Sequence, residues 1–348
     1  MDLYIKSLES ISPQDTFDKS DAFPDFIERR EPYFTCITPD FKKYIDNRML
    51  RRMTKILRFG VATAKLCLDN ANVMNPDAIV IGTGLGCLED TVKFLKQIIV
   101  NEEYLLNPTS FIQSTHNTVS GQIALLLGCK NYNLTFTQSD ISFENALIDA
   151  IMLLRDGDAE NVLVGGIDEI VGESYELINA SRCYKHTNHN RLSSDMFTLG
   201  EGATFFVISN NNSADCKCKI IDLNIINNII DLKALHQELL VFLDNNAILF
   251  EDIDFVVSGI NGLQSQNYIY NEFNSWFSNS NIVCYKSFVG EFDTAVSFGM
   301  YLGSKIIIHN NIPDKIILNR RNKINYSKGL VFNYTKDCNC SFILLSKC

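Results

Sequence analysis

The chain has 348 residues, a hydrophobic content of 46% and a formal net charge of −10 at pH 7. This length allows one large core or two fused smaller ones, because domains usually contain about 100–200 residues. The acidic charge argues against nucleic acid as the main partner, since phosphate binding relies on clustered Lys and Arg. The apolar runs fall short of the roughly 18 residues of a membrane span, and the polar start lacks a signal-peptide pattern. We therefore expect a cytoplasmic protein without a membrane span.

A row of basic residues marks the first amphipathic stretch. Apolar side chains alternate at helical spacing with Arg48, Arg51, Arg52, Lys55 and Arg58. A solvated helix face is one interpretation of these charges. A docking site for an acidic carrier protein is the other.

Short apolar runs then alternate with amphipathic stretches, which predicts an α/β fold with parallel strands joined by helices. The expected strands of the first half span residues 77–82, 133–138, 161–169 and 204–209, and its expected helices span residues 87–100, 116–128 and 143–157. Polar residues 210–215 have the composition of a linker. After them, strands are expected at 216–226, 254–262 and 341–347, and helices at 231–246 and 294–310. The strand at 254–262 resembles the strand at 161–169, which suggests two related halves.

Glycines and cysteines near these strands raise the question of cofactors. Gly82, Gly84 and Gly86 form a G-x-G-x-G turn that lacks the spacing of the dinucleotide fingerprint, so we expect no nicotinamide cofactor. Two C-x-C pairs could in principle form a four-thiolate zinc site, although alternation would place each pair on one face of a strand. The pairs are Cys216 with Cys218 and Cys338 with Cys340. We expect no metal and no other cofactor.

Several segments from about Phe41 onward resemble the β-ketoacyl synthases of the thiolase superfamily. The most specific match is the family's Gly-Glu-Gly-Ala, present at residues 200–203. Further matches lie at residues 51–71, 81–90 and 114–128. The resemblance implies a thiolase-like, five-layered αβαβα fold with two related halves, at residues 1–210 and 216–348. It also implies a dimer in which strands pair across a twofold axis.

Active members of this family use one cysteine and two histidines, and the matching positions here hold other residues. The cysteine sits at a helix start and carries the acyl chain, while the histidines stabilise the enolate that forms when carbon dioxide leaves. Counting back from Gly165 places the cysteine position at Asp140. The histidine positions fall on Ile260 and on Glu291, which follows a retained Lys286. A carboxylate cannot form a thioester, and Glu291 would repel a malonyl carboxylate.

Asp140 has two further interpretations. Aspartate is favoured at helix starts, where it accepts hydrogen bonds from free backbone amides, so we expect a capping role. Alternatively, Asp140 and Glu144 could form a carboxylate pair for acid/base chemistry.

Three catalytic losses in a retained framework resemble the chain-length factors, the inactive halves of heterodimeric ketosynthases that make polyketides and aryl polyenes. This resemblance implies a partner, an active ketosynthase subunit, and contact with acyl carrier protein through that partner. The side chains implied to line the shared tunnel are Phe111, Ser114, His116, Asn117 and Val119, which could equally be ordinary interface residues.

Two other functions remain open from the sequence. One is a divergent enzyme that uses Asp140, Glu144 and Glu291 for acyl transfer, decarboxylation or hydrolysis of acyl thioesters. The other is a structural homodimer without a tunnel.

Overall fold

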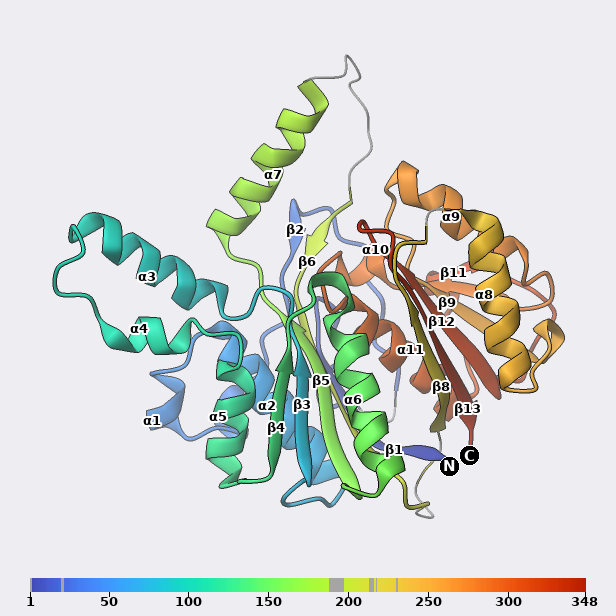
Figure 1. Cartoon of the computed structure of the whole chain (residues 1–348), viewed down its shortest axis with the longest axis horizontal. Helices are drawn as coiled ribbons and strands as arrows, with labels where there is room; N and C mark the ends of the chain where they lie inside the picture. Colours follow the sequence, from blue (N-terminus) through green and yellow to red (C-terminus); the bar gives the residue numbers. More distant parts are fainter. Residues whose placement is uncertain (1, 20–21, 188–196, 213–215, 217, 230) are drawn as a thin grey trace.

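A computed structural model describes residues 2–19, 22–187, 197–212, 216, 218–229 and 231–348. Figure 1 shows one large mixed sheet with helices on its faces. The strands are β1 Leu3–Ile11, β2 Tyr33–Phe34, β3 Ala78–Gly82, β4 Tyr132–Phe136, β5 Asn161–Asp168, β6 Leu199–Gly200, β7 Gly202–Ser209, β8 Cys218–Ile226, β9 Phe255–Ser258, β10 Asn281–Cys284, β11 Ile317–Asn319, β12 Lys328–Tyr334 and β13 Cys340–Lys347. The α-helices are α1 Asn47–Leu50, α2 Lys55–Asn70, α3 Leu88–Val100, α4 Pro108–Gln113, α5 Thr118–Leu127, α6 Ser142–Asp156, α7 Gly172–Thr187, α8 Leu232–Asn245, α9 Gln264–Ser275, α10 Lys286–Val289 and α11 Ala295–His309.

The strand order repeats between the two halves of the chain. The sheet runs β11-β10-β9-β12-β13-β8-β1-β7-β5-β3-β4. From the middle outward, β1-β7-β5-β3-β4 matches β8-β13-β12-β9-β10 in order. The directions match as well, because the outer pairs are parallel and the inner pairs are antiparallel in both sets. The expected α/β fold with two related halves is confirmed.

The strands that correspond between the two halves differ from those expected from the sequence. The strand at 254–262 was expected to correspond to the strand at 161–169, but their positions in the sheet make β9 the counterpart of β3, and β12 the counterpart of β5. Buried parallel strands all read as short apolar runs, so similarity between two of them does not identify the matching pair. The division at 210–216 remains our proposal, and the change from one repeat to the next between β7 and β8 supports it.

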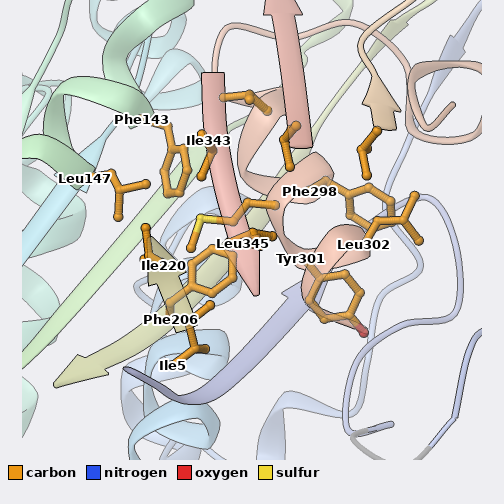
Figure 2. Close-up of a cluster of buried hydrophobic side chains, with 14 of the residues drawn as sticks. Ile5, Phe143, Leu147, Phe206, Ile220, Phe298, Tyr301, Leu302, Ile343 and Leu345 are labelled. Carbon is orange, nitrogen blue, oxygen red and sulfur yellow. The ribbon is translucent and has the colours of Figure 1, made fainter. Parts of the chain in front are cut away.

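Three buried clusters separate the helices into layers. Because successive side chains of a strand point to opposite faces, Ile79 and Ile81 pack with α2 and α5, whereas Ala78 and Val80 pack with α6. Figure 2 shows the central cluster, where Phe143 of α6 and Phe298 of α11 lie between the two halves of the sheet. A third cluster packs α8 and α9 against the outer face of the second half. The layers therefore follow the expected order αβαβα.

The described helices include none that is both long and apolar enough to cross a membrane.

The row of basic residues from Arg48 to Arg58, expected as a single helix face, is interrupted. Helix α1 ends at Leu50, and α2 begins at Lys55 after Thr54 in extended conformation. Arg51 and Arg52 therefore lie in the break between two helices.

Candidate functional site

The turn that precedes α6 forms the first part of the site. It contains a short 3₁₀ helix, Ser139–Ile141, that leads directly into α6. Gly82 at the end of β3 allows the close approach, because a Cβ there would lie 2.5 Å from the Ser142 carbonyl oxygen. Ser139 adopts a left-handed φ of 52°, which is costly for a residue other than glycine. The strand end and the helix start therefore hold Asp140 in a constrained turn.

Asp140 is half-buried in this turn. Burial raises the pKa of its carboxyl group, and the neighbouring Thr335 and Asn339 side chains partly offset that shift. Its Oδ2 atom is buried and has no hydrogen-bond partner in the described ranges of the chain. The expected capping role is wrong, because Ile141 occupies the N-cap of α6 and no side chain there accepts a hydrogen bond from the helix amides.

Glu144 lies one helical turn further on and is fully buried. Its Oε1 atom accepts hydrogen bonds from Asn333 Nδ2 at 3.2 Å and from Ser341 Oγ at 2.9 Å. Within the part of the chain that the structure describes, its Oε2 atom has no hydrogen-bond partner. Burial raises the pKa of Glu144 to about 7, because removal from water penalises the charged form more than these two donors stabilise it.

Lys286 and Glu291 form the other side of the site. Lys286 Nζ lies 2.8 Å from Glu291 Oε1, and the lysine side chain is only 4% exposed. Lys286 also donates to Asn333 Oδ1 at 3.0 Å, while Asn261 Nδ2 donates to Glu291 Oε2 at 2.7 Å. Asn333 therefore bridges the retained lysine and Glu144. The carboxylate at the expected histidine position is neutralised mainly by this chain's own lysine.

Asp293 adds a further carboxyl group beside these residues. Burial, together with the nearby charges of Asp168, Asp140 and Glu291, raises the pKa of Asp293 to about 7. Asp168 itself is held by hydrogen bonds from Thr83, Gly84 and Thr294, so it ties the ends of β3 and β5 to the start of α11. The site is consequently rich in carboxyl groups.

Ile260, the third expected position, contributes no polar atom. It is partly buried and packs against both the central cluster and the cluster of the second half. Asn261 beside it makes the polar contact to Glu291. The sequence reasoning missed Asn261, Asn333 and Ser341. Asn333 could have been noticed as a polar residue inside the apolar strand β12.

Disrupting the Lys286–Glu291 pair is expected to destabilise the protein. Glu291→Ala leaves a buried ammonium group with Asn333 as its neutral partner, which we expect to cost roughly 3 kcal/mol of unfolding free energy. The matched double variant Lys286→Met with Glu291→Ala should recover at least half of that loss. Urea denaturation at pH 7 measures both. Equal destabilisation of the single and double variants would contradict the pairing.

The residues implied to line a tunnel fall into two groups. Phe111, His116 and Asn117 are exposed and Ser114 is half-buried, all on or beside α4 and α5. Val119 is only 1% exposed and packs in the cluster beneath α5. A Cβ on Gly60 of α2 would lie 2.5 Å from Val119 Cγ1, so this side chain points into the chain's own core.

The basic residues around the α1–α2 break line a surface hollow of about 390 Å³. Lys93, Glu89 and Asp90 contribute from α3. Lys55 is already engaged, since its Nζ lies 2.6 Å from Glu201 Oε2. The basic row is therefore partly a structural element and partly an exposed surface.

The cysteine pairs considered for zinc lie at opposite ends of one strand ladder. Cys218 pairs with Lys347, whereas Cys340 pairs with Ile226, in the same β8–β13 register. Within the described residues, groups of three or more metal-binding side chains do not occur.

Comparison with known proteins finds a matching family model and curated relatives of similar sequence. A family model described as the N-terminal domain of β-ketoacyl synthase matches residues 39–196. The 3-oxoacyl-[acyl-carrier-protein] synthase 2 of Synechocystis sp. is 25% identical over 190 residues, which cover 50% of this chain and 46% of that protein. The Staphylococcus aureus protein of the same name is 24% identical over 207 residues, covering 54% of this chain and 51% of that protein. The chain thus spans about half of the length of these curated relatives.

Solved structures match over nearly the whole chain. The ishigamide ketosynthase/chain length factor has a TM-score of 0.81 at 16% identity and covers 99% of this chain and 98% of its own. A ketosynthase in complex with its chain length factor from Xenorhabdus doucetiae has a TM-score of 0.74 at 13% identity, with coverages of 100% and 98%. These matches confirm the expected thiolase-like fold. The family model over residues 39–196 and the retained residues 200–203 show that the first half of the chain is similar to β-ketoacyl synthases.

Proposed function

We propose that this chain is a non-catalytic subunit, similar to a chain-length factor, that pairs with an active β-ketoacyl synthase. In this role it shapes the tunnel for the growing acyl or polyene chain in polyketide or fatty-acid-like biosynthesis. The observation that carries the proposal is the replacement of a thiol and two imidazoles by Asp140, Ile260 and Glu291 within a retained framework.

The chemistry of the site supports a loss of condensation activity. A decarboxylating condensation develops negative charge on an enolate, which needs neutral or positive hydrogen-bond donors. The site instead brings Asp293 within range of the charges of Asp140 and Glu291, and Glu144 within range of the charge of Asp140. Its buried lysine, Lys286, is already paired with Glu291 at 2.8 Å. These residues oppose the charge that the reaction must develop.

The edge of the sheet supports the pairing with a partner. Strand β4 is the last strand of the sheet and, among the described residues, pairs only with β3. Apolar side chains stand exposed beside it, with Leu134 of β4 39% exposed and Leu125 of α5 71% exposed. Unpaired strand edges are sites of strand addition, and exposed apolar side chains around them mark an interface. A second ketosynthase subunit would continue the sheet here and cover both faces.

Contact with an acyl carrier protein is expected through that partner. A structure of a type II polyketide synthase acyl carrier protein in complex with its ketosynthase has a TM-score of 0.72 to this chain at 15% identity. The basic hollow at the α1–α2 break is a possible additional contact for an acidic carrier, because Arg51 and Arg52 are exposed there.

Product length tests the shaping role. The chain is co-expressed with a cysteine-bearing ketosynthase as the proposed partner, and the products of the purified complex are measured by mass spectrometry. Phe111→Ala and His116→Ala are expected to shift the products to longer chains, because each removes an exposed ring at the proposed interface. Ile324→Ala, an exposed change in the second half, is the matched control and should leave the products unchanged. Unaltered product length in both variants, with the complex intact, would contradict the shaping role.

A second candidate function rests on the unpartnered carboxyl oxygens. Asp140 Oδ2 and Glu144 Oε2 are buried without hydrogen-bond partners among the described residues, and burial raises the pKa of Glu144 to about 7. Such a pair could serve as acid and base in the hydrolysis or decarboxylation of an acyl thioester. Thioester turnover by the isolated chain that Asp140→Ala abolishes would favour this enzyme over the proposed subunit.

A further inference from the structure

Two cysteines meet at the end of the β8–β13 ladder, away from the candidate site. Cys348 Sγ lies 3.5 Å from Cys216 Sγ, with Cys348 exposed and Cys216 only 7% exposed. Cys216 Sγ also contacts the carbonyl oxygens of Ile5 and Cys218, each at 3.3 Å. The buried sulfur is therefore fixed in place next to the exposed one.

The backbone brings these sulfurs together independently of their side-chain positions. In the antiparallel β8–β13 register Lys347 pairs with Cys218, so Cys348 follows one strand while Cys216 precedes the other. Cys218 also pairs with Ile5 of β1, which places the cysteine pair at the junction of the two halves of the sheet. A covalent link here would join the last strand of the second half to the segment that leads into it.

We propose that Cys216 and Cys348 form a reversible disulfide bond when the protein meets a low-molecular-weight disulfide such as oxidised glutathione. The exposed Cys348 thiolate attacks the small disulfide, forms a mixed disulfide and releases one thiol. The Cys216 sulfur then loses its proton and attacks Cys348 Sγ, which releases the second thiol. In total, two protein thiols are oxidised to one disulfide, and one small disulfide is reduced to two thiols.

The environments of the two sulfurs determine their order of reaction. Cys348 is exposed and accessible to the oxidant. Burial, together with the adjacent Cys348, raises the pKa of the Cys216 thiol to about 12, so Cys216 is a poor first nucleophile. Its contact with Cys348 makes it the resolving residue. The sulfurs must approach from 3.5 Å to the roughly 2.05 Å of a disulfide bond, a movement that Cys348 can make after the end of β13.

The expected consequence is a more stable second half. A disulfide removes conformational freedom from the unfolded chain, and the effect grows with the length of the closed loop. The loop from Cys216 to Cys348 contains the whole second half. We therefore expect oxidation to raise the thermal midpoint, by on the order of 5 °C.

The experiment treats the purified full chain with oxidised glutathione and analyses it under non-reducing conditions. Peptide mapping should show a Cys216–Cys348 cross-link, and dithiothreitol should remove both the link and the rise in thermal midpoint. Cys216→Ser should stop the reaction at glutathione on Cys348, while Cys348→Ser should prevent both products. Cys338→Ser, which removes a half-buried thiol elsewhere in the second half, is the matched control and should cross-link as the unmodified chain does.

Three results would overturn the proposal. One is glutathione retained on Cys348 in the unmodified chain to the same extent as in the Cys216→Ser variant. Another is a cross-link between two chains through Cys348 in place of the internal bond. The third is an internal cross-link that leaves the thermal midpoint unchanged, which would refute the stabilising role. All of these readouts are independent of the proposed pairing with a ketosynthase.

Discussion

Replacing Leu125 and Leu134 with arginine is expected to weaken assembly with the proposed ketosynthase partner strongly while leaving this chain folded. Both side chains are exposed in the isolated chain, at 71% and 39%, so a charge there costs little before assembly. In the complex each arginine would be buried against an apolar surface without a partner for its charge. Interface anchors of this kind contribute about 2 kcal/mol or more each, so the double variant should weaken association by roughly 1,000-fold.

The position of these residues explains why their effect should be so large. Tyr132 and Leu134 face the same side of β4, as Tyr132 Oη approaches Asp149 of α6 at 3.4 Å. Leu125 belongs to α5, which contacts β4 on its other face through Ser120 and Thr135 at 2.8 Å. Figure 1 shows β4 at the edge of the sheet beside α5. An added partner strand would therefore meet both arginines, one on each face.

Size-exclusion chromatography with light scattering, followed by titration of the labelled partner, measures the effect. Ile324→Arg is the matched control, because Ile324 is 78% exposed in the second half of the chain. Association of the Leu125→Arg and Leu134→Arg double variant within threefold of the unmodified chain would place the interface elsewhere.

Glu144→Gln is expected to stabilise the protein at pH 8 and to have little effect at pH 4. The pKa of Glu144 rises from 4.5 to about 7 on folding, so the folded chain favours the neutral carboxyl group. The stability that this preference contributes is fully present below pH 4.5 and is lost as the pH rises through about 7. Glutamine keeps the neutral form at every pH. The variant should therefore gain on the order of 3 kcal/mol at pH 8.

Urea denaturation at the two pH values measures this difference. Oε1 of the introduced glutamine can accept from Asn333 and Ser341 as the glutamate does, so the local hydrogen bonds are preserved. Glu272→Gln on the surface of α9 is the matched control and should show no such pH dependence. Equal destabilisation by Glu144→Gln at both pH values would mean that the charged carboxylate is needed for the fold. A fall in any thioester turnover would support the enzyme alternative.

The sequence predicts the first half of the fold well because its strands are buried on both faces. Ala78–Gly82 is apolar throughout and Gly202–Ser209 is mostly apolar and fully buried, so both stand out from their surroundings. Strand β1 was missed, since its inward-facing positions include Ser7 and Glu9, which are buried and polar. Its stability comes from pairing with β7 and β8, which no local pattern reveals.

The sequence indicates three residue positions for the site, but it does not indicate which side chains contact one another there. Counting from glycine motifs indicated Asp140, Ile260 and Glu291. In the structure the charges of Asp140 and Glu291 both act on Asp293, while Ile260 precedes Asn261, which donates to Glu291. The link between Lys286 and Glu144 depends on Asn333, which is 47 and 189 residues away from them in the sequence. These contacts join β12 to Glu144 of α6 and to Lys286 of α10. They therefore follow from tertiary structure alone.

Acylation of each subunit tests the central claim most directly. A mixture of this chain and its cysteine-bearing ketosynthase partner is incubated with an acyl-[acyl carrier protein], and the intact mass of each chain is measured. The account predicts an acyl adduct on the partner and none on this chain, because Asp140 replaces the thiol that would hold a thioester. A stable acyl adduct on this chain, formed in the absence of the partner, would contradict it.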